Sequence, residues 1–180
     1  MGEISQPRPV LLFAAITSRH PSAIQWAIGR SVEQWGDVAL QSPLFDFTET
    51  GFYTKSMGID LKKKLVAFEG LVDPEQVAAN KVLSNLWEVE YNQASEFPED
   101  RPLNIDPGYV TEAKLVLATT KDRDHRIYLQ QGIYAEITLH FQSGQWQKSR
   151  WTYPDYQRDD FQDFLTKCRE FLRERLRELG

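Results

Sequence analysis

Three short segments of the sequence combine acidic, basic and aromatic residues in a way that suits a binding or catalytic site. They are Asn104-Ile105-Asp106-Pro107-Gly108-Tyr109, Thr119-Thr120-Lys121-Asp122-Arg123-Asp124-His125-Arg126 and Trp151-Thr152-Tyr153-Pro154-Asp155-Tyr156. Lysine and arginine side chains make charge-assisted hydrogen bonds to phosphates and carboxylates. Imidazole and carboxyl groups can transfer protons near neutral pH. If the three segments meet in the folded chain, we expect a site for a small anionic ligand, phosphate-bearing ones included.

This functional interpretation assigns roles to individual residues. Proton transfer is expected of His125, Glu136 and Asp106. Ligand binding is expected of Lys121, Arg126, Tyr134, Tyr153 and Asp155. Lys121 and Arg126 would hold the anion, and the tyrosines offer hydroxyl donors.

Each segment also has a purely structural interpretation. Pro107 and Gly108 are typical of a turn, in which Asp106 would bind nearby backbone N–H groups. The segment 119–126 would serve equally well as a solvated loop between two strands. Asp155 is a suitable N-cap for the last helix. The sequence leaves both interpretations open for all three segments.

Glu136 is expected inside a strand, where its surroundings decide its role. If helices cover its face of the sheet, the carboxylate needs a basic partner, since an unpaired buried charge is costly. The candidates for that partner are Arg126, Lys114 and Arg150. If the face is open, a polar ladder results that is either a solvated surface or the floor of a cleft. The ladder would consist of Tyr134, Glu136, Thr138 and His140.

Several other chemistries leave no trace in the sequence. There is no G-x-x-x-x-G-K-[ST] or G-x-G-x-x-G phosphate loop, no G-x-S-x-G elbow and no H-x-x-x-H pair. The single cysteine, Cys168, excludes an intrachain disulfide and a cysteine-based zinc cluster, and its place on an apolar stripe makes it a core residue. We therefore assign no metal site, and the sequence identifies no cofactor.

An alternative function is non-catalytic interaction or assembly. Aromatic residues make up 12% of the chain and gather at Trp146, Trp151, Tyr153 and Tyr156. If these side chains are exposed, they would mark an interface with another protein. The sequence does not give the oligomeric state.

Length and composition set the broad class. The 180 residues fit one domain, residues 1–180, and the hydrophobic and charged fractions of 41% and 26% are those of a globular protein. The net charge of -5 makes nucleic-acid binding a poor expectation. The longest apolar run, Val10 to Ile16, is too short to span a membrane, and no signal peptide is recognisable at the N-terminus. We expect a soluble, cytoplasmic protein.

The hydrophobic pattern predicts an α+β fold with a mostly antiparallel sheet. Strands are expected at 9–17, 44–47, 52–55 and 63–69, followed by a run of antiparallel strands between 104 and 151. Three main helices are expected: one from Pro21 to about Gly36, one capped by Asp73, and an amphipathic one at the C-terminus. Ala79, Leu83, Leu86 and Trp87 would form the buried stripe of the second helix.

The order of these elements favours a ferredoxin-like core with extra strands and with helices on one face of the sheet. The segment 93–102 is expected to be a long polar loop, and Gly132 a β-bulge. The lysine run Lys62-Lys63-Lys64 is interpreted as protection of a strand at the sheet edge.

The motifs also resemble a known family. Five motifs occur in the order seen in the prokaryotic family called domain of unknown function 4416: Asn104-Ile105-Asp106-Pro107-Gly108-Tyr109, Leu117-Ala118-Thr119-Thr120-Lys121-Asp122, His125-Arg126-Ile127-Tyr128-Leu129, Gly132-Ile133-Tyr134-Ala135-Glu136 and Thr152-Tyr153-Pro154-Asp155-Tyr156. The resemblance implies a self-contained prokaryotic cytoplasmic domain and no particular reaction. Where that family shows an acidic residue before Met-Gly, this chain has Ser56-Met57-Gly58, so a ligand role at that position would be altered here.

Overall fold

The computed structural model describes residues 2–49, 51 and 53–179, and these form an α+β fold around a nine-stranded sheet. The strands are β1 (Val10–Ser18), β2 (Val38–Gln41), β3 (Phe45–Asp46), β4 (Lys62–Val72), β5 (Asn104–Val110), β6 (Lys114–Thr119), β7 (Ile127–Gln130), β8 (Ile133–Gln142) and β9 (Gln145–Lys148). Every neighbouring pair is antiparallel, in the order β2-β4-β1-β5-β6-β8-β7, with β3 on β4 and β9 on β8. The antiparallel α+β prediction is therefore confirmed.

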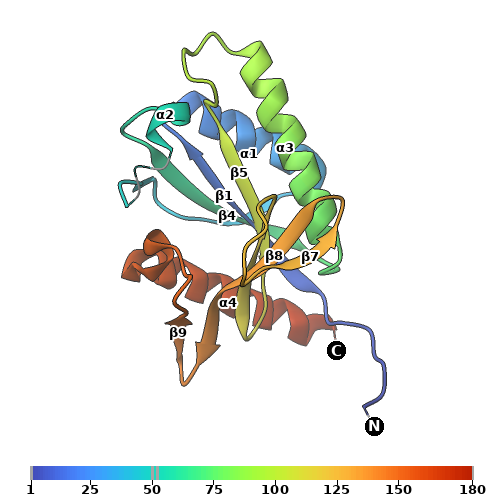
Figure 1. Ribbon diagram of the computed structural model, residues 1–180. Coiled ribbons are helices and arrows are strands. Elements are labelled where there is room, and N and C mark those ends of the chain that lie inside the picture. Colours follow the sequence, from blue (N-terminus) through green and yellow to red (C-terminus); the bar gives the residue numbers. More distant parts are fainter. Residues whose placement is uncertain (1, 50, 52, 180) are drawn as a thin grey trace.

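The helices cover both faces of the sheet (Figure 1). They are α1 (Pro21–Trp35), α2 (Thr54–Met57), α3 (Gln76–Ala94) and α4 (Asp159–Leu179), and a 3₁₀ turn, η1 (Pro154–Gln157), precedes α4. Side chains of α1 and α3 pack with Leu12, Ala14 and Ile16 of β1. Side chains of α4 pack with Leu11 and Phe13, which point to the opposite face. The expectation that helices lie on one face was wrong, because the apolar run Val10–Ile16 of β1 alternates between the two faces and needs cover on both sides.

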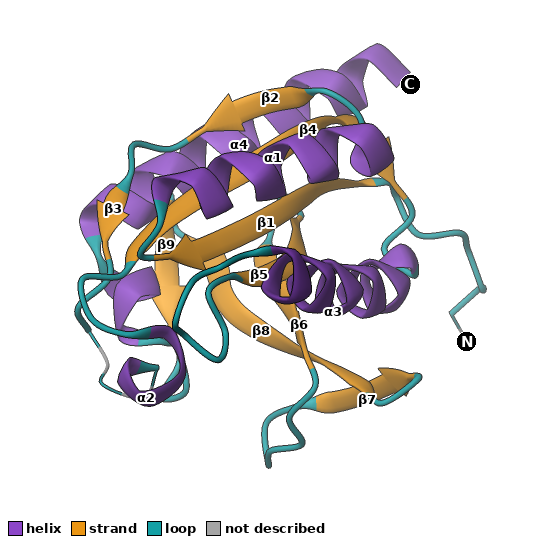
Figure 2. Cartoon of the chain, turned by 90° about the horizontal axis from the view of Figure 1, so that it is seen from above, coloured by secondary structure: helices purple, strands orange, loops and turns teal. Residues whose placement is uncertain are grey.

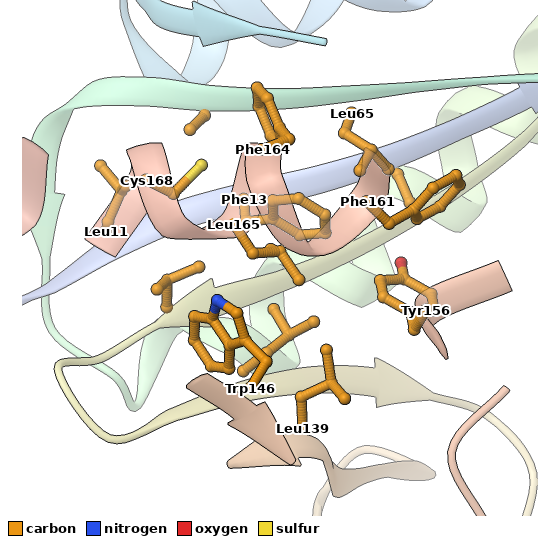
Figure 3. Packing of buried hydrophobic residues seen from close by; sticks show 14 of the residues in the cluster. Leu11, Phe13, Leu65, Leu139, Trp146, Tyr156, Phe161, Phe164, Leu165 and Cys168 are labelled. Carbon is orange, nitrogen blue, oxygen red and sulfur yellow. The ribbon is translucent and has the colours of Figure 1, made fainter. Parts of the chain in front are cut away.

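The last helix is the element that the sequence predicts best. Its 3.6-residue periodicity puts Phe161, Phe164, Leu165 and Cys168 on one side, and all four are buried. Figure 3 shows these side chains lying over β1 and β4, with Trp146 and Leu139 completing the cluster from β9 and β8. This packing fixes the start of α4, and with it η1, against the sheet.

Strand β1 lies at the centre of the first half of the fold. Helix α1 connects β1 to β2 with β4 between them, and α3 connects β4 to β5 with β1 between them. Figure 2 shows β2 at one end of the sheet and β7 at the other. The ferredoxin-like assignment of this core stays a prediction.

Several local predictions fail for identifiable reasons. The strand expected at 52–55 is in part the short helix α2, and residue 52 lies outside the described residues. Asp73 does not cap α3 but accepts a hydrogen bond from the N–H of Glu75, which forms a turn before the helix. Gly132 forms the two-residue β7–β8 turn rather than a bulge, since Gln131 and Gly132 both have positive φ.

Strands β5 and β6 separate along their length, and this separation opens a cleft. They pair only from Gly108↔Leu117 to Val110↔Leu115. Pro107, the next residue toward Ile105, has no N–H and so cannot donate a hydrogen bond to a longer ladder. Gly108 allows the close approach at the last pair, because a Cβ there would lie 2.2 Å from the carbonyl oxygen of Val116. The segment 104–109 is therefore a strand and not the turn that its Pro-Gly pair suggested.

Candidate functional site

The separated ends of β5 and β6 form the walls of a cleft of about 420 Å³. Residues 117–120 line one wall, Asn104 and Asp106 line the other, and η1, β4 and α3 close the remaining sides. Six basic side chains line it: Lys63, Lys81, Arg101, Lys121, Arg123 and Arg126. Four acidic ones do so: Glu49, Asp106, Glu136 and Asp155. The lining thus carries an excess of positive charge in a chain whose net charge is -5, which makes the cleft attractive to anions.

All three polar segments of the sequence contribute to this cleft. Asp106 comes from β5, Lys121 and Arg126 from the loop after β6, and Tyr153 and Asp155 from the residues around η1. They meet because β5, β6 and β8 are consecutive neighbours in the sheet and α4 holds η1 against it. Partial desolvation and the nearby Arg101 guanidinium lower the pKa of Lys121, which reflects the crowding of cations here.

Glu136 and Arg126 form the best-connected pair in the cleft. Arg126 Nε donates to Glu136 Oε2 over 2.7 Å, its Nη2 to the Tyr153 hydroxyl over 2.6 Å, and its Nη1 to the carbonyl oxygen of Lys121 over 2.9 Å. Both ionic side chains are almost completely buried. Arg126 is thus the partner that a buried Glu136 required, and it ties the 119–126 loop to η1. Among the described residues no donor reaches Glu136 Oε1, which stays accessible to solvent.

His125 does not line the cleft but lies behind Glu136. Its Nε2 is 3.0 Å from the same Glu136 Oε2, and its Nδ1 is 3.2 Å from Asp124 Oδ1. The imidazole ring stacks on Trp151 with 5.0 Å between ring centroids. A histidine in this position can exchange a proton with Glu136, but it cannot touch a ligand in the cleft directly.

Tyr134 is the one residue predicted to bind the ligand that lies outside the cleft lining. It pairs with Thr119 and Tyr128, and its ring contacts the Tyr128 ring edge to face at 5.4 Å. It does not line the cleft. The expected ladder on β8 is broken as well, since Glu136 and Thr138 are buried while His140 is exposed. An irregularity in the β6–β8 register interrupts the alternation.

Asp106 is held as an anion by two donors. Lys81 Nζ donates to its Oδ1 over 2.9 Å, and Asn104 Nδ2 donates to its Oδ2 over 2.7 Å. Burial opposes ionisation, but Lys81 and Asn104 outweigh it and lower the pKa of Asp106 to about 2. A carboxylate with such a pKa is a weak proton acceptor near neutral pH, so the arrangement favours an electrostatic role for Asp106 over the predicted proton transfer.

Helix α3 supports this wall with a polar stripe that the sequence analysis missed. Lys81 Nζ and Ser84 Oγ both donate to the carbonyl oxygen of Ile105, and Glu88 Oε1 accepts from its N–H over 2.7 Å. These contacts satisfy the backbone of β5 where β6 has separated from it. Glu88 also receives two hydrogen bonds from Arg101. Burial raises the pKa of Glu88, and the charges of Lys81 and Arg101 offset part of that increase.

The predicted apolar stripe of α3 was therefore wrong in part. Ala79 and Leu86 are exposed and Leu83 is half-buried, while Trp87 alone of the four is fully buried. The spacing of Lys81, Ser84 and Glu88 at i, i+3 and i+7 was a readable signal, since it places three polar residues on one helix face. It was overlooked because polar residues on a helix are ordinarily assigned to solvent.

Lys63 is a second residue that sequence reasoning misjudged. β4 is an interior strand, so the lysine run does not protect a sheet edge. Lys63 shares its face with Leu65 and Ala67 of the core, and its ammonium group binds Asp155 Oδ2 and lies 3.8 Å from the centre of the Phe47 ring. Asp155 consequently does not cap the last helix, which begins four residues later at Asp159.

Phenol groups line the part of the cleft nearest η1. Burial and the neighbouring Glu136 raise the pKa of Tyr153 to about 12, and burial also raises the pKa of Tyr53 and Tyr156. All three phenols therefore stay protonated and can donate hydrogen bonds at physiological pH. The Tyr156 hydroxyl is buried, and no residue of the described chain supplies it with a partner.

The aromatic residues considered for an interface are mostly unavailable. Trp146 and Tyr156 are 6% and 2% exposed and belong to the core under α4. Tyr153 is half-buried in the cleft, and only Trp151, at 40%, is exposed. These side chains do not form the exposed patch on which the interaction hypothesis depended.

Within the described ranges, no cluster of three or more histidine, cysteine or acidic side chains has a geometry that could hold a metal ion. Nor does any described helix have the length and apolarity needed to cross a bilayer. Ser56, at the position where an acidic residue was expected, does not line the cleft; its carbonyl oxygen accepts a hydrogen bond from the Arg101 N–H over 2.9 Å.

Fold and cleft together define an α+β domain whose antiparallel sheet opens into a basic, phenol-lined cleft. The chain belongs to the family described as domain of unknown function (DUF4416), whose model matches residues 8–171. No curated protein and no solved structure matches this chain.

Proposed function

We propose that the protein binds a small phosphate-bearing ligand in the cleft between β5 and β6. The observation that carries the proposal is the convergence of three polar segments, distant in the sequence, on one cavity whose lining is more basic than acidic. A volume of about 420 Å³ suits a small metabolite.

The mouth of the cleft supplies the anion-binding groups. Arg123 lines the cleft and is exposed, and its guanidinium group has no hydrogen-bond or ion-pair partner among the described residues. Lys121 lines the same edge two positions away. A guanidinium and an ammonium group side by side match the oxygens of a phosphate group. The deeper cations are each engaged by a carboxylate and are less suited to this task.

The cleft also contains the parts of an acid–base site. Glu136 exposes Oε1 to the cavity, and its other oxygen lies 3.0 Å from His125 Nε2. A proton taken from a bound ligand by Glu136 could pass to His125, which reaches the outer side of the sheet beside Trp151. If the protein is an enzyme, Glu136 is the catalytic residue and His125 is the positioning residue.

Thermal denaturation in the presence of candidate ligands tests the binding proposal. Inorganic phosphate and phosphate monoesters are expected to raise Tm, since a ligand at 100 times its Kd stabilises the folded state by about 2.7 kcal/mol. Arg123→Ala and Lys121→Ala should weaken the effect. Arg177→Ala on α4 removes the same charge outside the cleft and should leave it unchanged. The proposal fails if no phosphate compound raises the Tm of the wild type, or if all three variants respond like it.

A further inference from the structure

We infer that the ligand is a sugar phosphate, with its hydroxyl groups received by Glu136 and Asp155 at the floor of the cleft. This inference rests on the proposed function and specifies the part of the ligand that lies beyond the phosphate. It is drawn from the hydrogen-bonding capacity that the buried carboxylates leave unused.

In two of the four acidic side chains that line the cleft, only one of the two carboxylate oxygens has a hydrogen-bond donor within the protein. Glu136 is 5% exposed and Asp155 is 2% exposed. In each, one oxygen is fully engaged: Glu136 Oε2 by Arg126 and His125, and Asp155 Oδ2 by Lys63. The second oxygen of each has no donor among the described residues and is open to solvent in the cleft. A carboxylate oxygen is only an acceptor, so these two atoms are available to accept hydrogen bonds from a ligand's donors.

The other two acidic residues are saturated in the sense that each oxygen already has a donor within the protein, so they are less available to a ligand. Asp106 accepts a hydrogen bond from Lys81 on Oδ1 and one from Asn104 on Oδ2. Glu49 accepts a hydrogen bond from Arg158 on Oε1 and one from the N–H of Thr48 on Oε2. Among the four acidic residues that line the cleft, Glu136 and Asp155 are therefore the two with a carboxylate oxygen that has no donor within the described protein.

The charge balance at the floor decides which kind of donor fits. Each buried carboxylate there already has one cation: Lys63 for Asp155, Lys81 for Asp106, Arg101 for Glu88 and Arg126 for Glu136. An ammonium group would add an unbalanced charge to a buried region that is already neutral, and this is unfavourable. A hydroxyl group donates a hydrogen bond without adding charge. The floor is thus suited to a neutral, polyhydroxylated group.

Tyr156 adds a buried phenol to this end of the cleft. Its hydroxyl has no partner among the described residues, although the residue lines the cleft. A buried hydroxyl without a partner costs about 1–3 kcal/mol, so native proteins seldom leave one without a ligand or water.

Calorimetric titration with four phosphates tests the inference. We expect ribose 5-phosphate or glucose 6-phosphate to bind at least about tenfold more tightly than inorganic phosphate and phenyl phosphate, which carry no sugar hydroxyls. Equal affinity for all four would leave the phosphate site intact and overturn the sugar assignment. Binding of none would instead overturn the proposed function.

Three isosteric variants test which carboxylates bind the hydroxyl groups of the sugar phosphate. Glu136→Gln and Asp155→Asn keep an oxygen for the internal cation but turn an N–H₂ donor toward the cleft, so each should lower sugar phosphate affinity by about tenfold to a hundredfold. Their affinity for inorganic phosphate should stay close to that of the wild type, which also shows that they fold. Glu49→Gln changes a saturated carboxylate in the same cleft and should preserve the preference. Retention of the preference in both Glu136→Gln and Asp155→Asn would reject the inference.

Discussion

Lys63 and Asp155, 92 positions apart in the sequence, form a buried ion pair that joins β4 to η1 at the floor of the cleft. The ammonium group also lies over the Phe47 ring, so it is enclosed by an acid and an aromatic face. The pair holds Asp155 in place and leaves its other oxygen open to the cavity. The same contact therefore serves both stability and the proposed ligand binding.

Lys63→Met should destabilise the protein strongly. The substitution leaves the Asp155 carboxylate buried without its cation, and breaking a buried pair in this way costs about 3–5 kcal/mol. Urea denaturation measures the change in the free energy of unfolding. Lys62→Met provides the control, because the Lys62–Asp46 pair is exposed and such pairs contribute less than about 1 kcal/mol. A similar loss in both variants would contradict the assigned role of Lys63.

Asp106→Asn should cost stability in a pH-dependent manner. The pKa of Asp106 is lowered from 3.8 to about 2 in the folded protein, so its ionised form stabilises the fold. That contribution, roughly 2 kcal/mol, is fully present above pH 4 and is lost as the pH falls toward 2. Denaturation curves of wild type and variant between pH 7 and pH 2 should therefore converge as the solution is acidified. Asp122→Asn, at an exposed position, should change the unfolding free energy by less than about 0.5 kcal/mol at pH 7. If the difference in unfolding free energy between the wild type and Asp106→Asn does not change with pH, the carboxylate charge is not the source of the stabilisation.

Gly108→Ala should destabilise the junction of β5 and β6. The added methyl group would meet the Val116 carbonyl oxygen and Leu117, forcing the backbones apart at the last pair before the cleft. We expect a loss of about 1–3 kcal/mol, typical of overpacking. Gly70→Ala in β4 meets nothing within 4 Å and serves as the control. Equal thermal stability of the two variants would argue against a close approach at Gly108.

Cys168 should react with a thiol reagent only when the protein unfolds locally or globally. The side chain is fully buried in the α4 cluster, and burial raises the pKa of its thiol, so little thiolate is present or reachable. Labelling with a disulfide reagent should be slow in the native state and complete in denaturing guanidinium. A Leu165→Ala variant, which loosens the same cluster, should react faster. Rapid labelling of the native wild type would contradict the packing of α4.

Much of the fold follows from local patterns. The uninterrupted apolar run of β1, the periodicity of α4, and the positive-φ turn at Ser143-Gly144 each indicate their structures directly. The errors occur where tertiary contacts override local preference. Pro107-Gly108 lies within a strand because β1 pairs along the whole of β5, and the polar face of α3 is turned inward because β5 needs its donors and acceptor.

The sequence by itself indicated several of the polar residues that line the cleft. Asp106, Lys121, Arg126, Tyr153 and Asp155 line it, and Glu136 has the partner expected of a buried acid. Only the tertiary structure decided what each of them can do. Whether a carboxylate is saturated or open depends on donors such as Lys63, Lys81 and Asn104 that lie on other elements. Hydrogen bonds between side chains from distant segments have no signature in local spacing, because the folded sheet alone brings their donors and acceptors within reach.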